Sequence, residues 1–185
     1  LLGRAVSKFV PAEDLIVPYS ATSLEDADAI IHRIKISEND LRKQQVGGFY
    51  RDIPLTPGYE NETELEKKEK ELEGRKQSGR QEDVFTLLEC SINLDLEGFE
   101  DRGVDGEMTG IKLPYLVTIE ENSREVLSIR RNYEAADPKK KKINYFVHFK
   151  FLPGLGFYGF GLIHMIGGLS RTATAALRSL LDAGT

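Results

Sequence analysis

Three glycines in the C-terminal third of the chain have the spacing of a nucleotide-binding turn. Residues 154–159 read Gly-Leu-Gly-Phe-Tyr-Gly, the G-x-G-x-x-G pattern, and they stand between a predicted strand and a predicted helix. Phe157 and Tyr158 are bulky where a pyrophosphate needs a close backbone, and near Ser179 no acidic residue ends a second strand. The preceding elements are predicted hairpins, not βαβ units. We therefore predict a strand-to-helix corner packed by aromatic side chains, without a cofactor.

The side chains that could act as nucleophiles or metal ligands are few and scattered. Cys90 and Ser91 lie in mid-strand without the glycines of a nucleophile elbow, so nucleophilic catalysis has no support. His32, His148 and His164 have no second histidine or carboxylate at ligand spacing, which favours core or interface histidines. A metal site assembled from distant parts of the chain is the alternative. A single cysteine excludes a disulfide scaffold and a cysteine-based zinc site. We predict no catalytic or metal-binding residue.

A run of four lysines could bind phosphate. Lysine clusters bind the DNA backbone without sequence preference, although such a run also occurs as a solvated turn. The overall charge of −5 argues against a free-standing nucleic-acid binder, and residues 60–107 hold 16 acidic and 7 basic residues. Both interpretations of the run therefore stay open. Its members are Lys139, Lys140, Lys141 and Lys142.

Hydrophobic periodicity predicts the elements that would position these residues. The alternation at 30–36 indicates a half-buried strand; Ser37 with Asp40 then caps a helix over 38–46, which ends at Gly47 and Gly48. From residue 83 the chain is β-rich, with strands predicted at 85–96, 113–119, 126–130 and 143–151. The strand at 143–151 is partly aromatic on both faces, which predicts cover on both sides. The Glu/Lys-rich segment at 60–82 is predicted to be a solvent-exposed or neighbour-ordered helix followed by a loop.

The last element is a predicted amphipathic helix with a sustained apolar stripe. Small residues form a surface in the middle of this helix, so another helix could approach closely; they are Thr172, Ala173, Thr174, Ala175 and Ala176. No other predicted helix is long and apolar enough to be that neighbour, which places it outside this chain. The uncharged residues 151–170 contain Pro153 and many glycines, so we predict no membrane span. The residues predicted to pack are Leu162, Ile166, Leu169, Ala173, Ala176, Leu177 and Leu180.

Together these patterns predict an α+β fold, a hairpin-rich module followed by a long helix. We divide the chain into an α+β module at 1–150, carrying the charged Glu/Lys insertion at about 60–82, and a corner with the start of a helix at 151–185. The chain opens at Leu1 without methionine or a signal-like segment, and it closes directly after the helix pattern. We therefore expect a piece of a longer polypeptide, acting as a non-catalytic assembly module.

Several separated segments resemble, in order, the portal proteins of tailed bacteriophages, most closely those of short-tailed phages. The longest runs from Tyr145 through the glycine-rich corner and His164 to Thr185. The earlier segments at 11–19, 46–52 and 110–115 are similar to the same family. The resemblance is weakest in the Glu/Lys-rich segment.

This resemblance implies a homo-oligomer, a dodecameric ring at one capsid vertex of the virion, assembled in the cytoplasm of the bacterial host. Terminase would pump double-stranded DNA through the ring without sequence specificity, and tail or adaptor proteins would attach below it. Residues from about 11 to 150 would form the clip and adjoining β structure, and residues 159–182 would open a stem helix. The family supplies no catalytic residues.

Two other classes of function remain as alternatives. One is a phage or prophage head–tail docking module that is not itself the channel. The other is an enzyme that binds a nucleotide at the turn between Gly154 and Gly159.

Overall fold

The computed structural model describes residues 6–56, 68, 84–103, 105–154 and 156–184. The chain divides into two compact units. The first comprises Leu1–Pro18 and Asp28–Ile143, and the second comprises Tyr19–Ala27 and Asn144–Thr185. The sheet and the short helix belong to the first unit, and the long helix belongs to the second.

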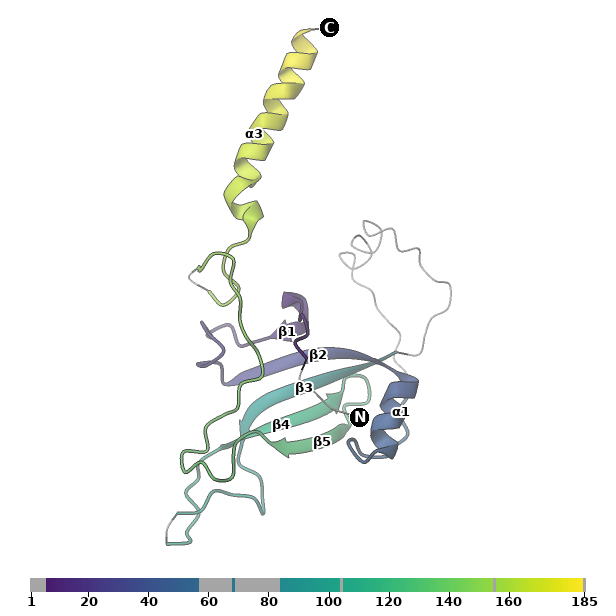
Figure 1. Cartoon of the computed structure of the whole chain (residues 1–185), viewed down its shortest axis with the longest axis vertical. Helices are drawn as coiled ribbons and strands as arrows, with labels where there is room; N and C mark the ends of the chain where they lie inside the picture. The colour runs from purple at the N-terminus through teal and green to yellow at the C-terminus, as the bar shows by residue number, and fades with distance from the viewer. Residues whose placement is uncertain (1–5, 57–67, 69–83, 104, 155, 185) are drawn as a thin grey trace. The chain divides into compact units, whose positions relative to one another are not determined.

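The first unit is built on a five-stranded antiparallel sheet in which each strand pairs with its neighbour in sequence (Figure 1). A 3-10 turn, η1, precedes the first strand, and the helix α1 follows the second. With the long helix α3 of the second unit, this confirms the predicted α+β fold, a strand-rich module followed by a long helix. The elements are η1 (Ala12–Asp14), β1 (Leu15–Ile16), β2 (Ala29–Ser37), α1 (Glu38–Val46), β3 (Val84–Leu94), β4 (Leu113–Glu120), β5 (Val126–Arg131) and α3 (Leu162–Ala183).

The passage from β2 into α1 follows the local sequence signals closely. The Ser37 hydroxyl accepts the N–H of Asp40 at 3.2 Å and so caps the helix as predicted. At the other end, Gly48 has φ +72°, a left-handed conformation in which a side chain would be strained. The strand, the cap and the helix stop are thus all confirmed, with Gly48 as the left-handed residue.

The two faces of the sheet carry separate hydrophobic clusters. Phe85 and Leu87 of β3 pack with Leu41 of α1 and with Leu127. Cys90, an odd number of residues further along the strand, points to the opposite face, where a second cluster is formed with residues of β4. Burial, followed by the nearby Glu89, raises the pKa of the Cys90 thiol, so it is a core side chain and a poor nucleophile.

A tight hairpin turn connects β4 and β5. The fully buried Glu120 carboxylate accepts the N–H of Ser123 at 2.6 Å and the side-chain amide of Asn122 at 3.3 Å. Arg124 adopts φ +58°, which completes the reversal. A carboxylate at the end of one strand therefore holds the tip of the hairpin.

One predicted strand is wrong. Residues 143–151 join no strand of the described chain, and the segment runs into the second unit as irregular backbone (Figure 1). Its alternating pattern is real, because the exposure of its side chains alternates along the chain, but no described strand pairs with it. The prediction for the Glu/Lys segment at 60–82 falls, apart from residue 68, outside the described residues.

Candidate functional site

The helix α3 is capped by a glycine at each end, Gly161 before it and Gly184 after it. The N–H of Gly161, the N-cap residue, donates to Nδ1 of His164 at 3.1 Å, which anchors the first turn. At the other end the N–H of Gly184 donates to the carbonyl of Leu181 at 3.2 Å. The 22-residue helix would be about 33 Å long at 1.5 Å per residue.

The seven residues predicted to pack share one face of α3. At about 100° per residue they fall within roughly a third of the helix circumference. None of the 22 residues is buried, and Leu169 and Leu180 are 72% and 70% exposed. An apolar face of this length is unusual on a free surface and typical of an interaction site. We call it the α3 apolar face: Leu162, Ile166, Leu169, Ala173, Ala176, Leu177 and Leu180.

The opposite side of α3 is polar. Arg171 and Arg178 lie one heptad apart on it. The hydroxyls of Thr172 and Thr174 donate back to the carbonyls of Gly168 and Ser170, at 3.1 and 2.8 Å, so their hydrogen bonds are satisfied within the helix. The helix is therefore divided cleanly into an apolar and a polar side.

The glycine pattern before α3 has a packing explanation. Leu152 and Phe160 exchange two backbone hydrogen bonds, which close the intervening residues into a loop. Gly159 has φ +69°, and a Cβ there would lie 2.6 Å from the carbonyl oxygen of Leu152. A Cβ on Gly154 would lie 3.0 Å from the ring of Phe160. A side chain at position 159 would therefore clash with the backbone, and one at position 154 would require the Phe160 ring to shift by a few tenths of an ångström, as expected for a tightly packed aromatic corner.

Aromatic and cationic side chains fill this corner. Phe157 is buried, and its ring stacks on that of His148 with centroids 4.2 Å apart. The Lys150 ammonium donates to the carbonyls of Thr22 and Gly156, at 3.1 and 3.3 Å. Burial, and secondly the charge of Lys150, lower the pKa of His148, which makes the neutral imidazole the dominant form at pH 7. The corner is thus a packed aromatic cluster.

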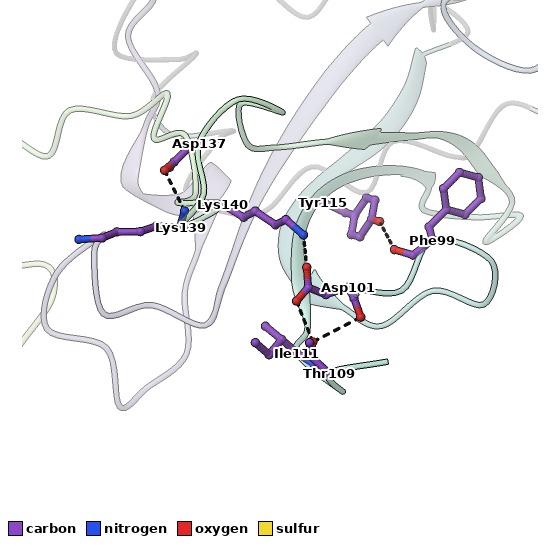
Figure 2. A network of polar contacts seen from close by, with 8 residues as sticks. All are labelled: Phe99, Asp101, Thr109, Ile111, Tyr115, Asp137, Lys139 and Lys140. Carbon is purple, nitrogen blue, oxygen red and sulfur yellow. Dashed lines mark hydrogen bonds and ion pairs between the residues drawn. The ribbon is translucent and has the colours of Figure 1, made fainter. Parts of the chain in front are cut away.

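The four lysines occupy a turn in which only part of the charge is free (Figure 2). Lys140 forms an ion pair with Asp101, whose carboxylate also accepts the Thr109 hydroxyl at 2.7 Å. Hydrogen bonds from Lys140 and then from Thr109 lower the pKa of Asp101. The side chains of Lys139 and Lys141 are exposed, whereas that of Lys142 is half-buried. Lys140 therefore acts within the chain, and the exposed Lys139 and Lys141 lie beside Asp137, whose carboxylate accepts the backbone N–H groups of both lysines at 3.0 Å.

The three histidines have different surroundings. His32 lies 3.8 Å from Glu89 on the neighbouring strand, His148 lies in the aromatic corner and His164 lies at the start of α3. Within the described residues, no group of three histidine, cysteine or acidic side chains could hold a metal ion. Among the described helices, none has the length and hydropathy needed to cross a membrane.

One exposed surface was not anticipated from the sequence. Every second residue from Tyr145 to Phe151 is exposed, whereas cover was predicted on both sides of this segment. The alternation itself was visible in the sequence, but nothing in it shows whether a neighbouring strand is present.

The comparisons with known proteins do not assign a family to this chain. No protein-family model matches the chain, and no curated protein matches it significantly.

Proposed function

We propose that this chain is a structural subunit of a bacteriophage portal ring, located at the capsid vertex and assembled in the host cytoplasm. In this proposal, α3 packs against α3 of neighbouring subunits, and double-stranded DNA passes through the channel that the subunits surround. Terminase and tail or adaptor proteins dock on the ring. The observation that carries the proposal is the exposed α3 apolar face, and the resemblance of several segments to portal proteins supports the choice of ring.

The spacing along the α3 apolar face favours packing between identical helices. Apolar residues recur at intervals of four and three, the pattern of helices that pack at a shallow angle with interlocking side chains. The two alanines would let the helix axes come within about 8–10 Å of each other. The residues in this series are Leu162, Ile166, Leu169, Ala173, Ala176 and Leu180.

The positions that flank this series carry no charge. Charged residues at such positions would repel their equivalents in a parallel neighbour or pair with them, and they normally select the partner. Here the flanks create no repulsion between identical subunits, and Ile163 and Leu177 widen the apolar surface enough for more than one neighbour. The flanking residues are Ile163, Ser170 and Leu177 on one side and Met165, Thr172 and Ser179 on the other.

The test compares two alanine substitutions in the full-length gene product. Ala173 lies at the centre of the α3 apolar face, whereas Ala175, two residues on, lies on the polar side; both are exposed. Ala173→Glu and Ala175→Glu change helix propensity equally, so the two variants differ in the face that receives the charge. We expect native mass spectrometry to show a large ring for the unsubstituted protein and for Ala175→Glu, and smaller species for Ala173→Glu.

Two results would contradict this proposal. A strictly monomeric unsubstituted protein at high concentration would exclude a ring. Equal assembly of the two variants would exclude the α3 apolar face as the contact. Cryo-microscopy of the particle separates the channel from the alternative docking module, because only a channel subunit surrounds the DNA path.

A further inference from the structure

The strand β5 forms one outer edge of the sheet (Figure 1). Among the described helices and strands, only β4 contacts it. The loop after α1 is hydrogen-bonded to the beginning of β5, where the N–H of Arg51 donates to the carbonyl of Leu127 at 2.9 Å. The second half of the strand has no such neighbour along its outer side. We call this stretch, Ile129–Arg131, the β5 edge.

The register of β4 and β5 shows which backbone groups face outward. The carbonyl of Pro114 accepts the N–H of Asn132 at 3.0 Å, so these residues form a hydrogen-bonded pair. Such pairs recur at every second residue of an antiparallel ladder, which turns the backbone groups of Arg130 toward β4. The N–H and carbonyl groups of Ile129 and Arg131 therefore point away from the sheet, and no described residue forms a hydrogen bond with them. An edge of this kind is a template for an added strand.

Three arginines lie on the β5 edge or beside the start of its strand. Arg51 donates to the carbonyl of Val126 at 3.1 Å. Arg130 donates to the carbonyl of Phe49 at 3.0 Å, and its guanidinium lies 3.5 Å from the centroid of the Phe49 ring. These contacts fix two guanidinium groups and leave them further N–H donors, since each carries five. Arg131 is exposed, and its guanidinium has no partner among the described residues.

These charges indicate an acidic partner. No acidic residue occurs between Glu125 and Glu134, so the arginines of β5 have no counter-charge on their own strand. Successive residues of an added antiparallel strand would lie opposite Arg131, then Arg130, then Ile129. Because the two arginines point to opposite faces, two successive acidic residues would match both of them, and an apolar residue would follow opposite the exposed Ile129. The β5 edge thus favours a particular order of side chains in its partner.

We propose that the β5 edge binds an extended segment of another protein as an added antiparallel strand, in which two acidic residues precede an apolar one. A second copy of the chain is disfavoured, because pairing of two such edges about Ile129 would place the two Arg130 side chains diagonally on the same face. A nucleic acid could neutralise the arginines, but it has no peptide groups for the open main chain. The proposal uses no residue of α3, so it stands or falls separately from the proposed ring.

The probe is a fluorescent seven-residue peptide with two glutamates followed by valine, flanked by two threonines on each side. One control peptide carries lysines in place of the glutamates, and another places the valine before the glutamates. We expect fluorescence anisotropy with the unsubstituted protein to show at least tenfold tighter binding of the glutamate peptide than of the lysine peptide. The glutamate peptide should also bind at least threefold more tightly than the reordered one, with an affinity that falls as salt is added.

Methylation of single peptide nitrogens tests the main-chain hydrogen bonds without changing the protein. In the proposed register, the amides of the first glutamate and of the valine face the β5 edge, whereas the amide of the second glutamate points away. N-methylation at the first glutamate and the valine should therefore abolish binding. N-methylation at the second glutamate should change the affinity less than threefold.

Substitutions on the β5 edge test the same contacts from the side of the protein. Ile129→Pro removes an N–H that faces away from β4, a position at which an edge strand tolerates proline, and Ile129→Val keeps this N–H. Both variants should keep the circular dichroism spectrum of the unsubstituted protein. Ile129→Pro should weaken binding of the glutamate peptide at least tenfold, and Ile129→Val less than threefold. Arg131→Gln should weaken binding and its salt dependence, whereas Arg131→Lys should keep most of both.

Each contrary result overturns the proposal. Equal binding of the glutamate and lysine peptides removes the acidic partner. Equal binding by Ile129→Pro and Ile129→Val removes the strand pairing; should Ile129→Pro unfold, the two N-methylated peptides decide this point. Binding of an oligothymidine in place of the peptides would reassign the β5 edge to nucleic acid. Self-association that is lost in Ile129→Pro but kept in Ala173→Glu would reassign it to a second copy of the chain.

Discussion

Gly159 is the residue at which the conformation of the corner depends most directly on the absence of a side chain. Its φ is +69°, and a Cβ would lie only 2.6 Å from the Leu152 carbonyl oxygen, which leaves no room for alanine. We expect Gly159→Ala to destabilise the loop by roughly 1–3 kcal/mol and to increase amide hydrogen exchange at Leu152 and Phe160. Gly156→Ala is the control, because a Cβ there meets nothing within 4 Å. Equal exchange in the two variants would refute this account.

Among the connecting elements, two loops are joined by the Asp101–Lys140 ion pair (Figure 2). The pKa of Asp101 is lower in the folded chain than in the unfolded one. The pair therefore stabilises the fold above the ordinary aspartate pKa of about 3.9, and this contribution is lost as the pH falls through the folded pKa. We expect Lys140→Met to lower the thermal midpoint at pH 7, and we expect the difference from the unsubstituted protein to be smaller near pH 2, where more of the Asp101 carboxylate is protonated. Lys139→Met should have no effect at either pH, and an equal loss in both variants would contradict the assignment.

The elements that could be predicted from the sequence are those whose signals lie within a few neighbouring residues. The Ser37 cap and the alternation of Ile34 and Ile36 are short-range signals, and the structure follows them. The α3 apolar face was also predictable, because helical spacing alone places its residues together. The Asp101–Lys140 pair joins residues 39 apart, and no local pattern encodes it. The alternation of side chains at 143–151 is the same in an extended chain whether or not another strand is hydrogen-bonded to it. The strand prediction for these residues was therefore wrong.

For the molecule as a whole, α3 adds a long apolar surface without adding to the buried interior, since none of its residues is buried. We expect a chain that ends after Gly161 to unfold at the same denaturant midpoint as the 185-residue chain, measured by tyrosine fluorescence, to which Tyr115 contributes from its buried position in β4. The truncated chain should also lose any concentration-dependent assembly. A clear fall in the midpoint would mean that α3 stabilises the sheet of its own chain and does not serve only as a contact with a neighbouring subunit.

Because Cys90 is buried, a label can be attached selectively to a cysteine introduced elsewhere in the chain. The Cys90 thiol is the single one in the sequence, lies in the core and has a raised pKa, so maleimide reagents should leave it largely unmodified in the native state. A cysteine introduced at an exposed position away from the α3 apolar face, such as Ala175 or Val147, would then be almost the only residue to carry a spin label or a dye. Distances between such labels in neighbouring molecules would report directly on how they are arranged.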